Sequence, residues 1–125
     1  MAAIRKLMSA AQIEGARVVS AHGEDLGKIK DVLVEATSSQ IVYAVISYGG
    51  IAGLVGNKLY AVPWDVLAYN AGHDAYVLDI AEEKLKEAPI FNPATLQDIA
   101  DARWAEPIHK YYGSKASWYA ESSTV

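Results

Sequence analysis

The stretch from Ile41 to Trp64, IVYAVISYGGIAGLVGNKLYAVPW, decides the fold. Its opening part, Ile41 to Tyr48, is apolar on both faces of an extended chain, which predicts a central strand covered on both sides. The glycine-rich segment Gly49 to Asn57 predicts a loop, and Lys58 to Val62 a return strand ended by Pro63, which cannot donate to a ladder. No side chain in this stretch titrates near neutral pH, so it predicts the centre of a small rolled sheet rather than a catalytic loop.

Further strands are expected on both sides of this centre, over residues 16–20 and 26–35 before it and 76–80 after it. The alternation in 26–35 slips phase near Lys30 and Asp31, as a β-bulge would cause. Residues 64–67 are expected to form a single helical turn and residues 69–74 a connection. The sequence therefore predicts a mainly β protein, with a small barrel of about five to six strands in a meander.

Short helices are expected at both ends of the barrel. Ser9 and Gln12 have the form of a capping box, which predicts a helical turn that ends at Gly15. After the last strand, residues 81–88 have helical spacing and Pro89 ends them. The sequence therefore predicts an N-terminal extension with a short helical turn at 1–12, the barrel at 13–80, a C-terminal helical extension at 81–113 and a tail at 114–125.

The helical extension carries several start and stop signals. Asn92 is an N-cap candidate followed by Pro93 at the first helical position, and Asp101 is a candidate cap for the next helix. The stripe expected to be buried on the first of these helices is Leu96, Ile99 and Ala100, and that on the second is Trp104, Ile108, Tyr111 and Tyr112. Pro107 predicts a kink or a fresh helix start, and Gly113 a C-cap.

Composition excludes several classes of protein. The chain has 125 residues, no cysteine and a net charge of −4. The lack of cysteine removes thiol nucleophiles, disulfides and thiolate metal sites. The negative charge argues against nucleic acid as a partner, because non-specific binding depends on clustered cations. No segment approaches the roughly 20 apolar residues of a membrane span, and no signal peptide is evident, so a cytoplasmic protein is expected.

Two motifs together resemble the PRC-barrel family. The first is the turn and strand Gly23-Glu24-Asp25-Leu26-Gly27-Lys28-Ile29-Lys30-Asp31, and the second is the strand end Val62-Pro63-Trp64. The resemblance covers roughly Ile13 to Ile80. The helical segment that follows looks like the extension seen in free-standing bacterial members.

The family includes the cytoplasmic domain of the photosynthetic reaction-centre H subunit and the C-terminal domain of ribosome maturation factors. The resemblance implies a small β-barrel adaptor without a common chemistry, whose relatives bind proteins or assemble with themselves. Neither specialised role carries over, because nothing in this sequence matches the membrane helix of the former or the N-terminal domain of the latter.

The chemical motifs that the chain suggests fail on spacing. In the glycine-rich loop Asn57 precedes Lys58 and Leu59 follows it, whereas a phosphate-binding loop needs glycine before lysine and a hydroxyl residue after it. The histidines, His22, His73 and His109, lack metal-ligand neighbours, so surface positions are expected. We therefore expect no catalytic residue, no cofactor and no metal; the remaining candidates for an undescribed enzyme are Asp31, Glu35 and His73.

A cluster of apolar and aromatic residues lies in and around the glycine-rich loop. Apolar side chains in a loop that should be exposed indicate contact with a partner, and tyrosine and tryptophan are favoured at such interfaces. The candidate interaction surface consists of Tyr48, Gly49, Gly50, Ile51, Leu54, Val55 and Trp64.

These observations favour a non-catalytic interaction or adaptor module whose protein partner is unknown and which forms a homodimer. The alternative is a small-ligand-binding regulatory domain, with the glycine-rich loop as a lid over a pocket beside Tyr48 and Trp64. Trp118 and Tyr119 in the tail either dock back on the barrel or cover a neighbouring subunit; the sequence leaves both open.

Overall fold

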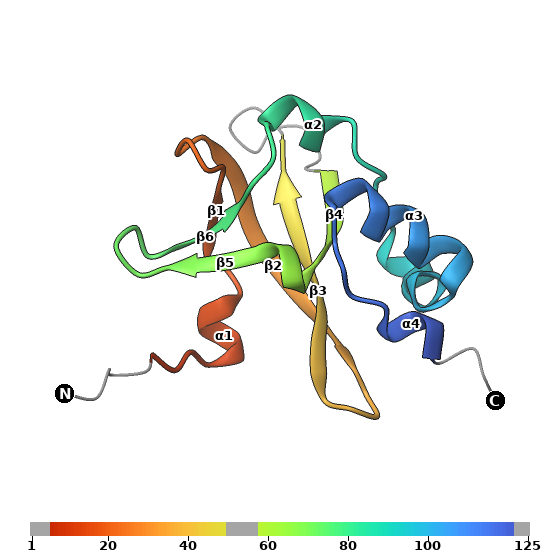
Figure 1. Ribbon diagram of the computed structural model, residues 1–125. Helices are drawn as coiled ribbons and strands as arrows, with labels where there is room; N and C mark the ends of the chain where they lie inside the picture. The colour runs from red at the N-terminus through yellow and green to blue at the C-terminus, as the bar shows by residue number, and fades with distance from the viewer. Residues whose placement is uncertain (1–5, 50–57, 122–125) are drawn as a thin grey trace.

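The computed structural model describes residues 6–49 and 58–121. They form a six-stranded, strongly curled sheet in the order β4-β3-β2-β1-β6-β5, followed by short helices (Figure 1). The predicted class, mainly β with a small barrel and C-terminal helices, is therefore confirmed. The strands are β1 Arg17–Val19, β2 Asp25–Glu35, β3 Gln40–Tyr48, β4 Lys58–Pro63, β5 Leu67–Asn70 and β6 Ala75–Leu78.

The first four strands form the predicted antiparallel meander, but the last two do not extend it. β5 and β6 form a hairpin, and β6 joins the other edge of the sheet by pairing in parallel with β1. Tyr69 and Asn70, predicted to lie in a connection, belong to β5, where Tyr69 pairs with Tyr76. That prediction was wrong because β6, a later segment, supplies the ladder partner.

β2 bends sharply against β3, and its irregularities explain how the sheet curls. The register shifts between Ile29 and Asp31, which confirms the predicted bulge, and shifts again between Leu33 and Val34. Asp31 is exposed there, and its carboxylate accepts a hydrogen bond from the Val32 amide at 2.8 Å. Bulges increase local twist, which lets a small sheet close around a core.

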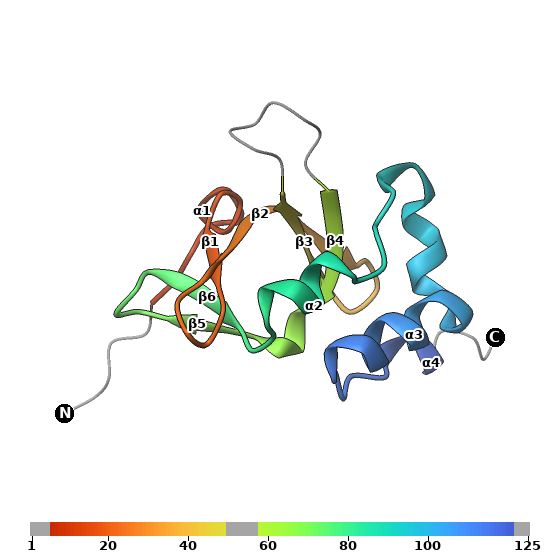
Figure 2. The ribbon, with the colours of Figure 1, turned by 90° about the horizontal axis from the view of Figure 1, so that it is seen from above.

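The inside of the curl holds the main hydrophobic core. β3 contributes Ala44 and Ile46 to it, as expected for a central strand. The helix α2, Glu82–Lys86, adds Leu85 from the open side of the curl, where Figure 2 shows it between β6 and β4. The other fully buried members from the strands include Val18, Leu26, Ile29, Tyr60, Val62 and Leu78.

The helices begin where the sequence places their caps. α1, Ala10–Ile13, has the predicted capping box; η3, Pro93–Ala100, is capped by Asn92; and α3, Ala102–Tyr112, is capped by Asp101. Gly113 ends α3 in the left-handed conformation. The predicted turn after β4 is the 3₁₀ helix η2, Trp64–Val66, and the last helix is α4, Trp118–Glu121.

Two expectations for the helical segment were wrong. Of the kink or fresh start expected at Pro107, the fresh start was wrong, because α3 is one helix through that position with Ala105, His109 and Tyr112 buried on either side; a kink there stays a prediction. Leu96 and Trp104, placed on buried stripes, are exposed. Both helices bury a narrower face than the sequence pattern indicated.

The helical segment covers the outer face of the sheet at β3 and β4. Figures 1 and 2 show α3 and α4 beside β4, outside the curl and away from β5 and α1. The Phe91 amide also donates to the carbonyl of Leu59 at 2.8 Å. The edge strand β4 is thereby partly capped, which lowers its tendency to pair with another chain.

Candidate interaction surface

A second, smaller core lies between the outer face of the sheet and the helical segment. Tyr43 and Val45 of β3 and Ala61 of β4 point outward into it, and Phe91 and Ile99 close it from the helical side. β3 therefore alternates between two cores, which is why its sequence is apolar on both faces.

A chain of hydrogen bonds runs through this outer core. The Tyr43 hydroxyl lies 3.0 Å from His109 Nε2 and 3.1 Å from the carbonyl oxygen of Ile99. His109 Nδ1 lies 2.8 Å from Ser114 Oγ, which donates to Asp65 Oδ1 at 2.6 Å. We call these groups the outer polar chain. The prediction of a surface position for His109 was wrong: the side chain is 2 % exposed.

The proton positions in the outer polar chain follow from its acceptors. Because Ser114 gives its proton to Asp65, its oxygen can only accept from His109, so Nδ1 carries hydrogen. The Tyr43 hydroxyl lies within hydrogen-bond distance of both Nε2 and the Ile99 carbonyl oxygen, and its single proton can go to only one of them at a time. Burial lowers the pKa of His109, with Asp65 acting in the opposite direction, and raises the pKa of Tyr43. Burial therefore favours the neutral imidazole, whereas Asp65 favours the charged one.

The outer polar chain fastens the C-terminal segment to the barrel. Trp118 packs edge-on against Tyr43, with ring centroids 5.7 Å apart, and Tyr119 lies 4.8 Å from the His109 ring. Of the two roles left open for these aromatics, the structure has them dock back on their own barrel. Tyr43 and His109 are buried at one end of this chain and Asp65 is exposed at the other, and every one of these groups is engaged by its neighbours, which suits them to holding structure.

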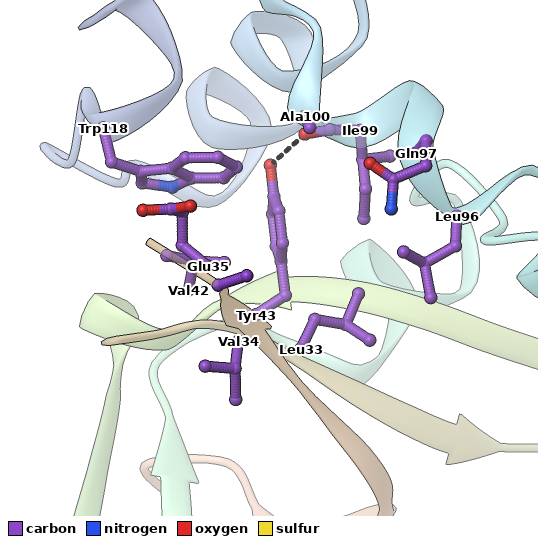
Figure 3. A pocket seen from close by; sticks show the side chains of 11 residues that line it. Leu33, Val34, Glu35, Val42, Tyr43, Leu96, Gln97, Ile99, Ala100 and Trp118 are labelled. Atoms are coloured by element: carbon purple, nitrogen blue, oxygen red, sulfur yellow. Dashed lines mark hydrogen bonds between the residues drawn. The ribbon is translucent and has the colours of Figure 1, made fainter. Parts of the chain in front are cut away.

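A small hollow opens beside this core. Its volume is about 190 Å³, and Figure 3 shows Leu33 and Tyr43 of the strands on the side of Leu96 and Ile99 of η3, with Trp118 at one side and the Val34 side chain pointing away. The dashed line in Figure 3 is the bond from the Tyr43 hydroxyl to the Ile99 carbonyl.

A larger apolar groove lies on the other side of η3. It has a volume of about 530 Å³ and runs between β4, the segment that precedes η3, and α3. Ile90 and Trp104 line it and are 62 % and 55 % exposed. Ile99 lines both the hollow and the groove, so η3 separates two parts of one apolar region. We define the η3 surface as its exposed apolar residues, Val34, Ile90, Leu96 and Trp104.

The interaction surface predicted around the glycine-rich loop falls largely outside the described residues. Gly50, Ile51, Leu54 and Val55 all lie there. Among the described members, the half-buried Tyr48 donates its hydroxyl to the Glu82 carboxylate, and the half-buried Trp64 packs on Tyr76 with ring centroids 5.4 Å apart. Gly49 is exposed.

Tyr48 and Trp64 lie at opposite ends of β4. Tyr48 pairs with Lys58 at its start, whereas Trp64 follows Pro63, which pairs with Tyr43. Neither residue lines the hollow or the groove beside η3. The loop surface and the alternative ligand pocket therefore stay predictions.

The residues considered for catalysis are engaged separately. The Glu35 carboxylate accepts bonds from the amides of Thr37 and Ser38, at 2.9 and 3.0 Å, and these bonds lower its pKa. Asp31 accepts from the next amide at the bulge, and His73 is exposed in the β5–β6 turn. Within residues 6–49 and 58–121, no group of three or more histidine and acidic side chains is placed to hold a metal ion.

A family model matches most of the chain. The model of the PRC-barrel domain matches residues 5–85, which include the whole curled sheet and the start of α2. A search of curated proteins finds no match. No helix in the described part of the chain is long and apolar enough to cross a membrane.

Proposed function

Because the chain belongs to the PRC-barrel domain family, we propose that it is a non-catalytic interaction module of the cytoplasm that pairs with a second copy of itself through the η3 surface. In this proposal the paired module is an adaptor that presents its remaining surface, including the glycine-rich loop, to a protein partner. The observation that carries the proposal is the exposure of Trp104 and Ile90 in one apolar groove.

Exposed apolar side chains that gather in one place support this role. Scattered surface apolar residues are normal, but a contiguous patch with a polar rim is typical of a contact site. Tryptophan is the residue type most enriched at binding hot spots, because its large ring buries much area at little entropic cost. Trp104 therefore has the position and chemistry of an anchor.

The charges at the groove favour a second copy as its occupant. Asp98 and Arg103 both line the groove, so it carries both signs of charge, and Arg103 is ion-paired with Asp101 at 3.3 Å. A two-fold axis brings the same patch on two subunits together in reverse orientation, which lets an acidic group of one face a basic group of the other. In the proposed dimer the charges of the two copies would be complementary.

The proposal is tested by light scattering coupled to gel filtration over a concentration series. We expect the wild-type protein to dimerise reversibly and Trp104→Asp to shift the midpoint at least tenfold, which is a loss of about 1.4 kcal/mol or more. Ile90→Asp is expected to act in the same direction. Leu7→Asp is the matched control, since Leu7 is an exposed apolar residue that lines neither the groove nor the hollow.

A wild-type protein that stays monomeric at millimolar concentration would contradict the pairing. If Trp104→Asp and Leu7→Asp weaken dimerisation equally, the interface does not lie in the groove. Circular dichroism and thermal unfolding of each variant show whether a loss of pairing reflects the surface or the fold.

A further inference from the structure

Three cations lie together on the part of the sheet that the helical segment leaves open. Arg17 of β1 and Lys28 of β2 are direct partners in the antiparallel ladder, and Lys30 follows on β2 at the bulge. All three side chains are exposed. Like charges directly opposite each other in a sheet are destabilising, so this register carries a cost in the free protein.

Two carboxylates lie near these cations, and one of them, Asp25, lines the same cleft, but neither forms an ion pair with Arg17, Lys28 or Lys30. Asp25 accepts a hydrogen bond from the Gly27 amide at 2.9 Å, and Asp31 accepts from the Val32 amide. The ion pairs formed within the described ranges are Lys6–Asp74 and Arg103–Asp101, and neither includes Arg17, Lys28 or Lys30. A chain with a net charge of −4 thus holds three cations beside a single carboxylate, a local excess of positive charge.

These cations border an open cleft of about 540 Å³, which we call the basic cleft. Ser47 of β3 also lines it and is the ladder partner of Lys28, so Arg17, Lys28 and Ser47 form one row across neighbouring strands. Cβ atoms of such cross-strand partners lie about 4.5–5.5 Å apart. Long cationic side chains from this row can converge on one small group.

Two glycines leave part of the basic cleft without side chains. Gly15 and Gly27 both line it and add no side chain. At Gly27 the strands approach so closely that a Cβ atom would lie 2.2 Å from the Ser47 carbonyl oxygen. Asp25 and Ile29 also line the cleft, so a ligand there meets the donors of Arg17, Lys28, Lys30 and Ser47 together with one carboxylate.

We propose that the basic cleft binds a multivalent oxyanion, a phosphate or phosphate ester, through Arg17, Lys28, Lys30 and the Ser47 hydroxyl. Guanidinium groups match tetrahedral oxyanions with paired hydrogen bonds, and lysines add point charge. The bound anion removes the repulsion between Arg17 and Lys28, so binding stabilises this part of the sheet. Three cations suit a single phosphate-sized group better than a nucleic acid backbone, whose binding draws on many more contacts.

The proposal is tested by isothermal titration of the full chain with inorganic phosphate, pyrophosphate and phosphoserine at low salt. We expect saturable binding that weakens as salt rises, and at least tenfold weaker binding for Arg17→Gln. Lys110→Gln is the control, because it removes an exposed lysine of α3 that does not line the cleft. Tighter binding of pyrophosphate indicates a free polyphosphate as the natural ligand, and tighter binding of phosphoserine indicates a phosphorylated side chain.

Thermal unfolding gives an independent readout. Lys28→Gln is expected to raise the midpoint of the free protein, because it removes the like-charge pair, and to abolish the further rise that pyrophosphate causes in the wild type. The proposal is overturned if none of the three probes binds saturably, or if Arg17→Gln and Lys110→Gln bind as the wild type does. The Trp104→Asp variant is expected to bind the anion as the wild type does. A failure of anion binding can therefore be told apart from a failure of dimerisation.

Discussion

Two buried tyrosines, Tyr43 and Tyr112, show how differently the two faces of the sheet are built. Tyr43 points to the outer face, where its hydroxyl belongs to the outer polar chain. Tyr112 reaches from α3 into the core on the inner face, where its hydroxyl makes no hydrogen bond within the described residues. Burial raises the pKa of both, so both stay protonated at neutral pH.

The difference shows that the two cores depend on different interactions. The inner core is held by close packing of aliphatic and aromatic groups, which is non-directional and tolerates one unpaired hydroxyl. The outer core joins β3, η2, α3 and the C-terminal segment by directional bonds between residues far apart in the chain. The inner core therefore accounts for the curl, and the outer polar chain for where the helical segment sits.

The change expected to disturb both faces most is Gly27→Ala. The backbone at Gly27 has φ +105°, and the added Cβ would meet the Ser47 carbonyl at 2.2 Å. Strain and steric overlap together should lower the free energy of unfolding by roughly 3 kcal/mol or more. Chemical denaturation measures this.

Gly23→Ala is the matched control for Gly27→Ala. Gly23 also has a positive φ, +84°, but no other atom lies within 4 Å of the place that the alanine Cβ would take. Gly23→Ala should therefore lower the free energy of unfolding by only about 1 kcal/mol. Equal losses at the two positions would mean that the close approach of β2 to β3 is not what holds the curl.

Removing one hydroxyl from each face should change stability in opposite directions. Tyr43→Phe leaves the Ile99 carbonyl and His109 without their buried partner, and should cost about 2 kcal/mol. Tyr112→Phe removes a buried hydroxyl that has no partner among the described residues, and should be neutral or stabilising by up to about 1 kcal/mol.

Hydrogen exchange locates the effect of these two substitutions. Tyr43→Phe should raise exchange first in α3 and α4, and much less in β1 and β6. If Tyr43→Phe instead raises amide exchange equally throughout the sheet, the outer polar chain does not hold the helical segment independently of the rest of the fold. Tyr112→Phe, measured in parallel, reports any general effect of losing a hydroxyl.

A smaller effect is expected from pH, through His109. Its pKa is lowered in the folded protein, so below the ordinary imidazole value of 6.5 the unfolded chain binds more protons. The free energy of unfolding should then fall as pH drops below about 6.5. Above that pH the stabilising contribution of the neutral His109 should be fully present. Asp65, Tyr43, Ser114, Trp118 and Tyr119 are the groups that face the ring.

The measurement is urea denaturation at pH values between 7.5 and 5.5. This range stays above the titration of Glu35 and Asp101, whose pKa values are lowered by hydrogen bonds from neighbouring amides. His109→Gln should be less stable throughout but should show a shallower slope with pH. An unchanged slope in that variant would assign the pH dependence to another group.

The first four strands, β6 and the identity of the caps could be predicted from sequence because they rest on local signals. Alternation in β2 and β6, two-sided apolarity in β3, and the Ser9, Asn92 and Asp101 caps each depend on residues a few positions apart. The bulge near Lys30 was also visible, because a slip of phase moves side chains to the other face.

The site was much harder to predict. His109 looked like a surface residue because its partners, Tyr43, Asp65 and Ser114, are contributed mostly by other elements. Trp104 looked like a core residue because helical spacing does not reveal which part of an apolar stripe the rest of the chain covers. A tryptophan three residues before Pro107, on a helix rich in charged groups, was the available hint of an exposed anchor.

The sequence by itself determined the curled sheet of the PRC-barrel family, because strand periodicity, turn chemistry and the spacing of bulge and glycine act over short distances. Only the tertiary structure decided that β6 pairs in parallel with β1, that His109 is buried, that Trp104 is exposed and that Arg17 faces Lys28. Each of these depends on which distant segments meet, and contacts of that kind leave no periodic trace in a single sequence.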